Sequence, residues 1–148
     1  MAILEINIPD EFIFETKIDI RISDINYGKH VGHDAFISIL HEARVRFLHH
    51  FGFTETNIDG KGIVISDIAV IYKSQSFHGD TLTIKMAVTD FNKYGFDVFY
   101  QVSHSQNKTL VLKAKTGIVF FDYSENTIVQ IPDTFQSKWK SFNWGADK

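Results

Sequence analysis

Residues Arg21–Arg44 have the sequence RISDINYGKHVGHDAFISILHEAR. The first half is polar and glycine-containing, which is typical of a loop, whereas apolar residues in the second half have helical spacing. The segment holds three carboxylates, one carboxamide, three imidazoles and two glycines: Asp24, Asp34, Glu42, Asn26, His30, His33, His41, Gly28 and Gly32. Few structural loops need so many polar groups. We therefore expect the chemistry of the protein to lie here and the rest of the chain to be its scaffold.

A helix follows the loop. Apolar residues recur at three- and four-residue steps, at Phe36, Leu40, Ala43, Phe47 and Phe51. This spacing places them on one side of a helix that runs to about residue 51. Gly52 is a natural C-terminal stop, and His49 and His50 suit the negative end of the helix dipole. This is the only long helix that the periodicity predicts.

Strand patterns surround this helix. Upstream, apolar and charged residues alternate over Phe12–Ile22, which predicts a half-buried strand. Downstream, four segments rich in β-branched and aromatic residues are separated by the turn sequences HGD, NKYG and QNK. These four predicted strands are Gly62–Phe77, Thr81–Phe91, Phe96–Ser105 and Thr109–Asp122. After Pro132, helical spacing of Phe135, Trp139 and Phe142 predicts a short terminal helix.

The order of these elements predicts the fold class. The chain has 148 residues, 44% of them hydrophobic, which is the size of one ordinary domain with its own core. Short connections make consecutive strands antiparallel neighbours. A single helix is best covered by a curved sheet that wraps it. We therefore predict one α+β domain over residues 1–148, with a five-stranded antiparallel sheet around one long central helix.

Composition excludes several classes of function. With no cysteine, the chain has no thiolate nucleophile, no Cys–zinc site and no disulfide, which fits a reducing compartment. Its net charge is −3 and its Lys and Arg residues are scattered, so we expect no nucleic-acid partner. The N-terminal segment carries acidic residues, and no apolar run reaches membrane-spanning length. We therefore expect a cytoplasmic protein without a membrane span.

The pattern as a whole resembles a known family. A strand leads into an Asp-x-Asn loop, His-Val and a helix ending in Glu-Ala-Arg, and later strands begin at HGDTLTI and end in FFD before IP. This order resembles the hotdog-fold acyl-CoA thioesterases, in particular the branch of 4-hydroxybenzoyl-CoA thioesterase and the Tol-Pal-associated thioesterases. The resemblance extends from about Phe12 to Pro132. It implies a hotdog fold and a homodimer or homotetramer in which each site takes residues from both chains.

The family pattern can be placed on this sequence residue by residue. It consists of Asp-x-Asp, a short gap, Gly-His-Val-Asn-Asn, an aromatic residue in the helix and a final Glu-Glu-Ala-Arg. The corresponding positions here are Asp24, Asn26, Lys29, His30, Gly32, His33, Phe36 and the segment His41–Arg44. The second Asp of the pattern is the family's usual catalytic carboxylate, and the amide of Asn26 can act neither as base nor as nucleophile. In the Tol-Pal-associated members, a catalytic His occupies the position of His33.

The resemblance therefore implies a set of site residues. The implied catalytic group comprises Asp24, Asn26, His30, His33 and Glu42, and the implied substrate-binding group comprises Tyr27, Gly28, Gly32, Asp34 and Phe36. The base that activates water stays open between Asp24, Glu42 and His33, with Asn26 and His30 as positioning groups. We expect no cofactor. We also expect no metal, because His30 and His33 have no third ligand positioned by sequence.

Structural explanations for the same residues also stay open. Asp24 or Asn26 can form an Asx turn or a cap, and Asp34 can favour the helix N-terminus through its charge. Glu42 can pair with Arg46 four residues further along a solvated helix face.

The implied activity is hydrolysis of a thioester by an activated water at the N-terminus of the long helix, where backbone N–H groups stabilise the oxyanion. The substrate would be an acyl-CoA or an acyl-carrier thioester. Two alternatives remain: a non-catalytic acyl-CoA-binding hotdog module, because the usual carboxylate is absent, and a hotdog hydratase or dehydratase that uses Asp24 with His30. We expect at least a dimer, with the strand Gly62–Phe77 as the candidate interface.

Overall fold

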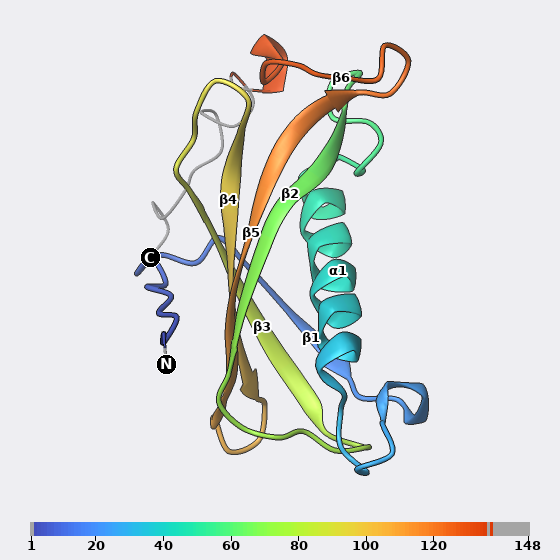
Figure 1. The fold of residues 1–148 in the computed structure, drawn as a ribbon, viewed down its shortest axis with the longest axis vertical. Coiled ribbons are helices and arrows are strands. Elements are labelled where there is room, and N and C mark those ends of the chain that lie inside the picture. The colour runs from blue at the N-terminus through green and yellow to red at the C-terminus, as the bar shows by residue number, and fades with distance from the viewer. Residues whose placement is uncertain (1, 136, 138–148) are drawn as a thin grey trace.

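An antiparallel sheet and one 18-residue helix form most of the computed structural model, which describes residues 2–135 and 137 (Figure 1). The sheet order is β1-β3-β4-β5-β2, and a short β6 pairs with β5. Every strand pairing is antiparallel. The strands are β1 (Phe14–Asp19), β2 (Gly62–Tyr72), β3 (Thr81–Thr89), β4 (Gly95–His104), β5 (Leu110–Asp122) and β6 (Thr127–Ile128). The predicted α+β class and antiparallel sheet are confirmed.

The strand count and some strand ends differ from the prediction. Within the described residues the sheet has six strands, because residues beyond Asp122 turn back and a two-residue β6 pairs with Phe121 and Asp122. Two residues are too few to give a detectable period. The predicted strand Phe12–Ile22 is too long, since Ile22–Asp24 form the 3-10 turn η1 and β1 ends at Asp19.

The predicted strand Gly62–Phe77 is also too long, because β2 ends at Tyr72. The residues that follow leave the sheet and run toward the loop in front of the helix. There the carbonyl of Ser76 accepts a hydrogen bond from Val31 N at 2.8 Å. Lys73 N and Ser74 N still donate to the Val111 carbonyl of β5, and only then does the chain turn to this contact with a segment 45 positions away, which no local pattern signals.

Helix α1 (His33–His50) packs one side against the sheet (Figure 1). The predicted stripe is confirmed, because Leu40, Ala43 and Phe47 are fully buried. Gly52 has φ +86°, and Gly52 N and Phe53 N donate to the carbonyls of His49 and Leu48 at 3.0 and 2.8 Å. This is a Schellman ending, in which glycine supplies the left-handed residue after the helix.

The opposite side of α1 is only partly covered in the single chain. Ile37 and Val45 are exposed there. The sheet therefore lies along one side of the helix, and the prediction that it wraps the helix holds only in part. None of the helices within residues 2–135 and 137 is long and apolar enough to cross a membrane.

The terminal helix falls partly outside the described residues. Residues 133–135 are helical, as predicted. The buried ring of Phe135 lies 5.3 Å from Phe53 and 5.2 Å from Phe120, centroid to centroid, and so closes one end of the core. Trp139 and Phe142, which the prediction also included, are not among the described residues.

A buried charge fixes the helix on the sheet. Arg44 Nε donates to Glu55 Oε2 at 2.9 Å, and Arg44 Nη1 donates to the Tyr100 hydroxyl at 3.3 Å. The Tyr100 and Thr116 hydroxyls share a hydrogen bond of 2.7 Å. Burial raises the pKa of the Tyr100 phenol, which therefore stays neutral. The network joins α1 to β4, to β5 and to the loop that precedes β2.

Glu55 is the anion of this network. Burial alone would raise the pKa of Glu55, but hydrogen bonds from Arg44 and His41 outweigh it and hold that pKa below its ordinary value of 4.5. The contribution of the carboxylate to folding is therefore fully present above pH 4.5 and is lost as the pH falls through the lower folded-state value.

We expect Glu55→Gln to lower the free energy of unfolding by about 2 kcal/mol at pH 7, because it leaves the buried Arg44 guanidinium without an anion. The difference between the variant and the parent should shrink as the pH falls below 4.5. Urea unfolding at several pH values measures both effects, with the exposed Glu125→Gln as control. A variant with parental stability at pH 7 would show that the ion pair does not stabilise the fold.

Candidate active site

A tight loop precedes α1 and brings several of the predicted residues together. Asn26 N donates to the His30 carbonyl at 2.9 Å, and Lys29 N donates to the Asn26 carbonyl at 3.0 Å. The Asn26 side chain takes part as well, because its Oδ1 accepts a hydrogen bond from Gly28 N at 2.9 Å. Asn26 is thus an Asx-turn residue, which was one of the two interpretations of this position.

Lys29 has a left-handed backbone conformation, with φ 66°. This conformation favours glycine, because an L side chain there crowds the following carbonyl. The family pattern has Gly at the position of Lys29. The backbone therefore keeps the shape that a glycine would take, although the side chain has changed.

Contacts on both sides hold the loop in place. Val31 N donates to the Ser76 carbonyl at 2.8 Å, and Gly32 N donates to the Asp24 carbonyl at 3.3 Å. Tyr72 OH donates to the His33 carbonyl at 2.9 Å, and its ring lies 5.7 Å from that of the buried Phe36. Partial burial, assisted by the charge of Asp34, raises the pKa of Tyr72. Sequence reasoning missed the contributions of Tyr72 and Ser76, because nothing in their own segments signals contact with this loop.

The first turn of α1 presents N–H donors for which the described part of the chain shows no acceptor. Gly32 is the N-cap residue and makes no side-chain cap. The N–H groups of His33, Asp34 and Ala35 lie in the first turn, where a helix has no internal acceptors. A Cβ added to Gly32 would lie 2.6 Å from Asp34 Oδ1 and 3.5 Å from Asn26 Cβ, so both side chains flank this point. The positive end of the helix is therefore bordered by polar groups.

His30 has a defined orientation beside this helix start. Its Nδ1 lies 3.1 Å from the Val31 carbonyl, which can only accept, so Nδ1 carries the proton in the neutral ring. Nε2 is then the basic nitrogen. A Cβ added to Gly28 would lie 3.1 Å from His30 Nε2 and 3.3 Å from Asn26 Oδ1. The imidazole of His30 and the carboxamide of Asn26 thus both lie next to Gly28, on the side where a side chain of that residue would be.

Two predicted carboxylates lie together elsewhere, on the side of α1 that faces β1. Asp24 and Glu42 line one cavity of about 480 Å³. Asp24 is only 7% exposed, and its Oδ2 accepts a hydrogen bond from Arg21 N at 2.8 Å, which closes η1. Glu42 pairs with Arg46 at 2.7 Å, and Arg46 also donates to the Lys17 carbonyl at 2.8 Å.

The structure therefore divides the predicted site residues into two clusters. Asn26 and Asp34 flank Gly32 at the start of α1, and Asn26 also adjoins Gly28 and, across it, His30. Asp24 and Glu42 belong to the cavity against β1, and each has a basic partner.

The remaining predicted residues differ from one another in exposure. His33 and Tyr27 are exposed, and Phe36 is buried. Within residues 2–135 and 137, no group of three or more His, Asp or Glu side chains is arranged to hold a metal ion.

A comparison with known protein families gives a match over most of the chain. Residues 20–139 match the sequence model described as the thioesterase-like superfamily. No curated protein sequence matches the chain.

Several solved structures are similar to this one. A 1,4-dihydroxy-2-naphthoyl-CoA thioesterase from Synechocystis superimposes with a TM-score of 0.79 at 18% identity, covering 88% of this chain and 97% of that one. A DHNA-CoA thioesterase from Staphylococcus aureus has a TM-score of 0.72 at 19% identity, covering 85% of each chain. A probable thioesterase from Bartonella henselae has a TM-score of 0.71 at 17% identity, covering 83% of this chain and 100% of that one.

The left-handed residue in the loop gives a stability test. We expect Lys29→Val to lower the free energy of unfolding by about 1–2 kcal/mol, because a β-branched side chain at positive φ is strained. Lys29→Gly should have a free energy of unfolding close to that of the parent. Glycine accepts this conformation without strain, but it also makes the unfolded chain more flexible, and the two effects oppose each other. Urea unfolding at neutral pH compares the three proteins. Equal stability of the Val variant and the parent would contradict the left-handed conformation at residue 29.

Proposed function

Since this chain belongs to the thioesterase-like superfamily, we propose that it hydrolyses acyl-CoA thioesters at the start of α1. Membership of the superfamily agrees with the resemblance found in the sequence. The observation that carries the proposal is the loop in front of an uncapped helix N-terminus, where the Asn26 side chain lies beside Gly32 and, across Gly28, near the His30 ring, whose Nε2 is its basic nitrogen.

The helix start supplies electrostatic stabilisation. A thioester carbonyl placed there would accept hydrogen bonds from first-turn N–H groups, and the helix dipole would favour the negative charge that develops on its oxygen. Removal of one such donor in other enzymes costs about 10²–10³ in kcat.

His30 is the base that the geometry favours. Nε2 would take a proton from a water molecule, whose oxygen attacks the thioester carbon. The tetrahedral intermediate then collapses as the C–S bond breaks, and the departing sulfur receives the proton from the imidazolium. The hydrogen bond to the Val31 carbonyl keeps Nδ1 protonated and the ring oriented. Asn26 would hold the water or the carbonyl through its carboxamide N–H groups, since its oxygen serves the loop.

The other candidate bases are less well placed for this task. The Asp24 carboxylate is engaged by Arg21, and Glu42 is 53% exposed and engaged by Arg46. His33 lies in the first turn and is exposed, with no side-chain hydrogen bond in the described residues to orient its ring. The absence of the usual second carboxylate at Asn26 favours one alternative function, a module that binds acyl-CoA without cleaving it.

Substitution of His30 tests the catalytic assignment. We expect His30→Asn to lower kcat for an acyl-CoA substrate by about 10²–10⁴ with little change in KM, because it removes the base and keeps a polar side chain. Thiol release from purified protein measures the rate. His49→Asn, at the exposed far end of the helix, is the matched control and should keep parental kcat.

Further variants separate the alternatives. Glu42→Gln and His33→Asn should retain kcat within a few-fold. A large loss in either of them, with full activity in His30→Asn, would move the base to that residue. If the parent binds acyl-CoA but releases no thiol from thioesters of short, long or aromatic acyl groups, the protein is a module that binds acyl-CoA without cleaving it.

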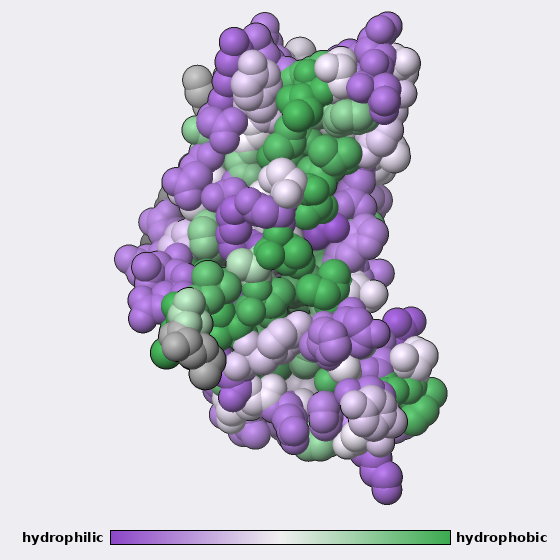
Figure 2. All heavy atoms as spheres, viewed as in Figure 1, coloured by the Kyte–Doolittle hydropathy of each residue, from purple (hydrophilic) through white to green (hydrophobic). Residues whose placement is uncertain are grey.

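We also propose that two chains associate through β2. This strand pairs with β5 along one edge and forms an end of the sheet. Ile68 is opposite the buried Thr116 and so points to the helix side of the sheet, yet it is 43% exposed. Figure 2 shows apolar atoms gathered in a band on the face that carries β2 and α1. A second copy would cover both the apolar band and the unpaired edge.

An added charge in this band tests the assembly. We expect the parent to have the mass of at least two chains at micromolar concentration, and Ile68→Lys to have the mass of one, because a buried unpaired lysine would oppose association. Light scattering after size exclusion gives the masses. Ile128→Lys makes the same change on the exposed β6 and should leave the assembly intact. A monomeric parent would refute the dimer.

A further inference from the structure

Three segments meet at one end of the domain, at the bottom of Figure 1. We call this surface the loop end, and it consists of residues 20–31, 73–80 and 104–109. Ile20 N donates to the Asp80 carbonyl and Val31 N to the Ser76 carbonyl, each at 2.8 Å. Both ends of the loop before α1 are therefore tied to the same short segment, and the middle of the loop is held out from it.

Large apolar side chains stand out from the loop end. Tyr27 is fully exposed, Ile22 is 70% exposed and Phe77 is 47% exposed. Ile22 and Tyr27 lie between the two tied ends of the loop, and Phe77 lies on the segment to which the loop is tied. One exposed apolar side chain is ordinary on a protein surface, but a group of them on adjoining segments is typical of an interaction site.

The loop end also carries an excess of positive charge. Its charged residues are four cations and two carboxylates: Arg21, Lys29, Lys73, Lys108, Asp24 and Asp80. The net charge of this end is therefore +2 with histidine counted as neutral, whereas that of the whole chain is −3. The cations are far apart in the sequence, and the fold brings them to one end.

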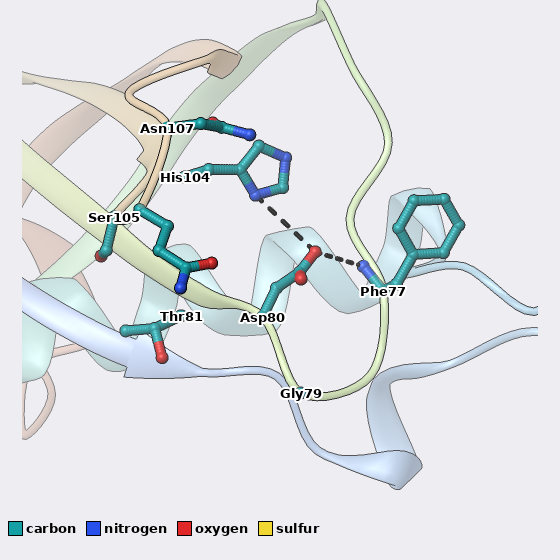
Figure 3. A pocket seen from close by; sticks show the side chains of 8 residues that line it. Phe77, Gly79, Asp80, Thr81, His104, Ser105 and Asn107 are labelled. Carbon is teal, nitrogen blue, oxygen red and sulfur yellow. Dashed lines mark hydrogen bonds and ion pairs between the residues drawn. The ribbon is translucent and has the colours of Figure 1, made fainter.

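Both carboxylates of the loop end have partners. Asp24 is buried and accepts a backbone hydrogen bond at 2.8 Å. Asp80 Oδ2 accepts a hydrogen bond from Phe77 N at 2.8 Å and lies 3.6 Å from His104 Nδ1, as Figure 3 shows. His104 Nε2 in turn lies 3.1 Å from the Gln75 carbonyl, which joins the third segment to the second. The exposed charge at this end is therefore mainly positive.

The opposite end of the domain has the reverse balance of charge. The end of α1, the β3–β4 turn and the chain after β5 hold two cations and five carboxylates, within residues 51–61, 91–95 and 122–133. The net charge there is −3. The N-terminus of α1, which is the positive end of the helix dipole, lies beside the loop end. An anionic surface would therefore attract the loop end and repel the opposite end.

We propose that the loop end docks on an anionic membrane surface, with Ile22, Tyr27 and Phe77 among the lipid headgroups and the cations around them. Lysine and arginine beside a membrane bind anionic headgroups, and tyrosine suits a boundary that is apolar on one side and wet on the other. This inference goes beyond the proposed hydrolysis and does not depend on it.

The form of the surface favours a bilayer over other anionic partners. Apolar side chains on an exposed loop can insert between lipids without a matching cavity, whereas a folded protein would have to provide one. Nucleic acid would attract the cations but offers no apolar medium for Ile22. A lipid surface accommodates both kinds of side chain at once.

Sedimentation with vesicles tests the docking. The parent should bind vesicles of an equal mixture of phosphatidylcholine and phosphatidylglycerol, and it should bind vesicles of phosphatidylcholine alone at least about tenfold more weakly. Added salt should weaken the binding, because it screens the cations. No binding to the mixed vesicles, or equal binding to both kinds, would overturn the inference.

A charge variant tests the cations. Lys29→Gln/Lys73→Gln should bind the mixed vesicles at least about tenfold more weakly than the parent. Lys61→Gln/Lys93→Gln removes the same charge at the opposite end and should keep parental binding. Urea unfolding of both variants establishes that they are folded. An equal loss in the two variants would show that net charge, and not the loop end, determines binding.

An apolar variant tests the side chains that would enter the lipid. Ile22→Ser/Tyr27→Ser should bind at least about tenfold more weakly and should remain folded, because both side chains are exposed. Ile128→Ser/Tyr94→Ser makes the same changes in exposed side chains at the opposite end and should bind as the parent does. Parental binding by the first variant would refute insertion of the loop.

The chain has no cysteine, so a single introduced thiol can report the orientation. Tyr27→Cys and Ile128→Cys each carry one environment-sensitive fluorophore. With mixed vesicles, emission from the label at position 27 should shift to the blue, and emission from the label at position 128 should not change. A shift at position 128 alone would overturn the proposed orientation.

Duplex DNA provides the test against the other anionic partner. Binding to DNA and not to the mixed vesicles would overturn the membrane and assign the surface to nucleic acid. None of these measurements uses a thioester. Docking therefore stands or falls on vesicle binding alone, and thiol release decides the hydrolysis separately.

Discussion

A guanidinium buried under the helix constrains the rest of the domain. Arg44 must meet an anion, since an unpaired charge in the interior costs several kcal/mol. Glu55 supplies that anion from the loop after the helix, and Tyr100 supplies a neutral acceptor from β4. Rotation of α1 about its axis would break both contacts. The direction in which the first turn of the helix points, 11 residues upstream, is therefore fixed by a charge on its inner side.

Local spacing predicted the elements of this fold but not all of their ends. The stripe through Leu40 and Phe47 follows directly from the helical period, and the turn signals separate the later strands correctly. The ends fail where a distant partner intervenes. Ile22 continues the alternation of β1, yet Asp24 closes a 3-10 turn around it by capping Arg21 N. The predicted second strand runs on to Phe77, yet Ser76 is held by Val31.

The same distinction applies to the candidate site. Residue types and spacing identified the loop, and the resemblance added candidate roles for its members. They did not show which side chains already have partners. Asp24 is engaged by Arg21, Glu42 by Arg46 and the oxygen of Asn26 by Gly28, whereas His30 is oriented by one carbonyl and keeps Nε2 for other contacts. These pairings depend on side-chain directions, which a linear pattern does not contain.

The strand order has a consequence for how the chain acquires its structure. β2 (residues 62–72) lies beside β5 (residues 110–122), so nearly 40 residues must be synthesised between the end of one strand and the start of its partner. At the usual 5–20 residues per second, the ribosome needs about two to eight seconds for them. During that interval, β2 has no partner strand, because β5 is its neighbour in the sheet. The sheet is therefore completed late in synthesis. Any pause before β5 is made prolongs the time in which the unpaired backbone of β2 can pair with another chain.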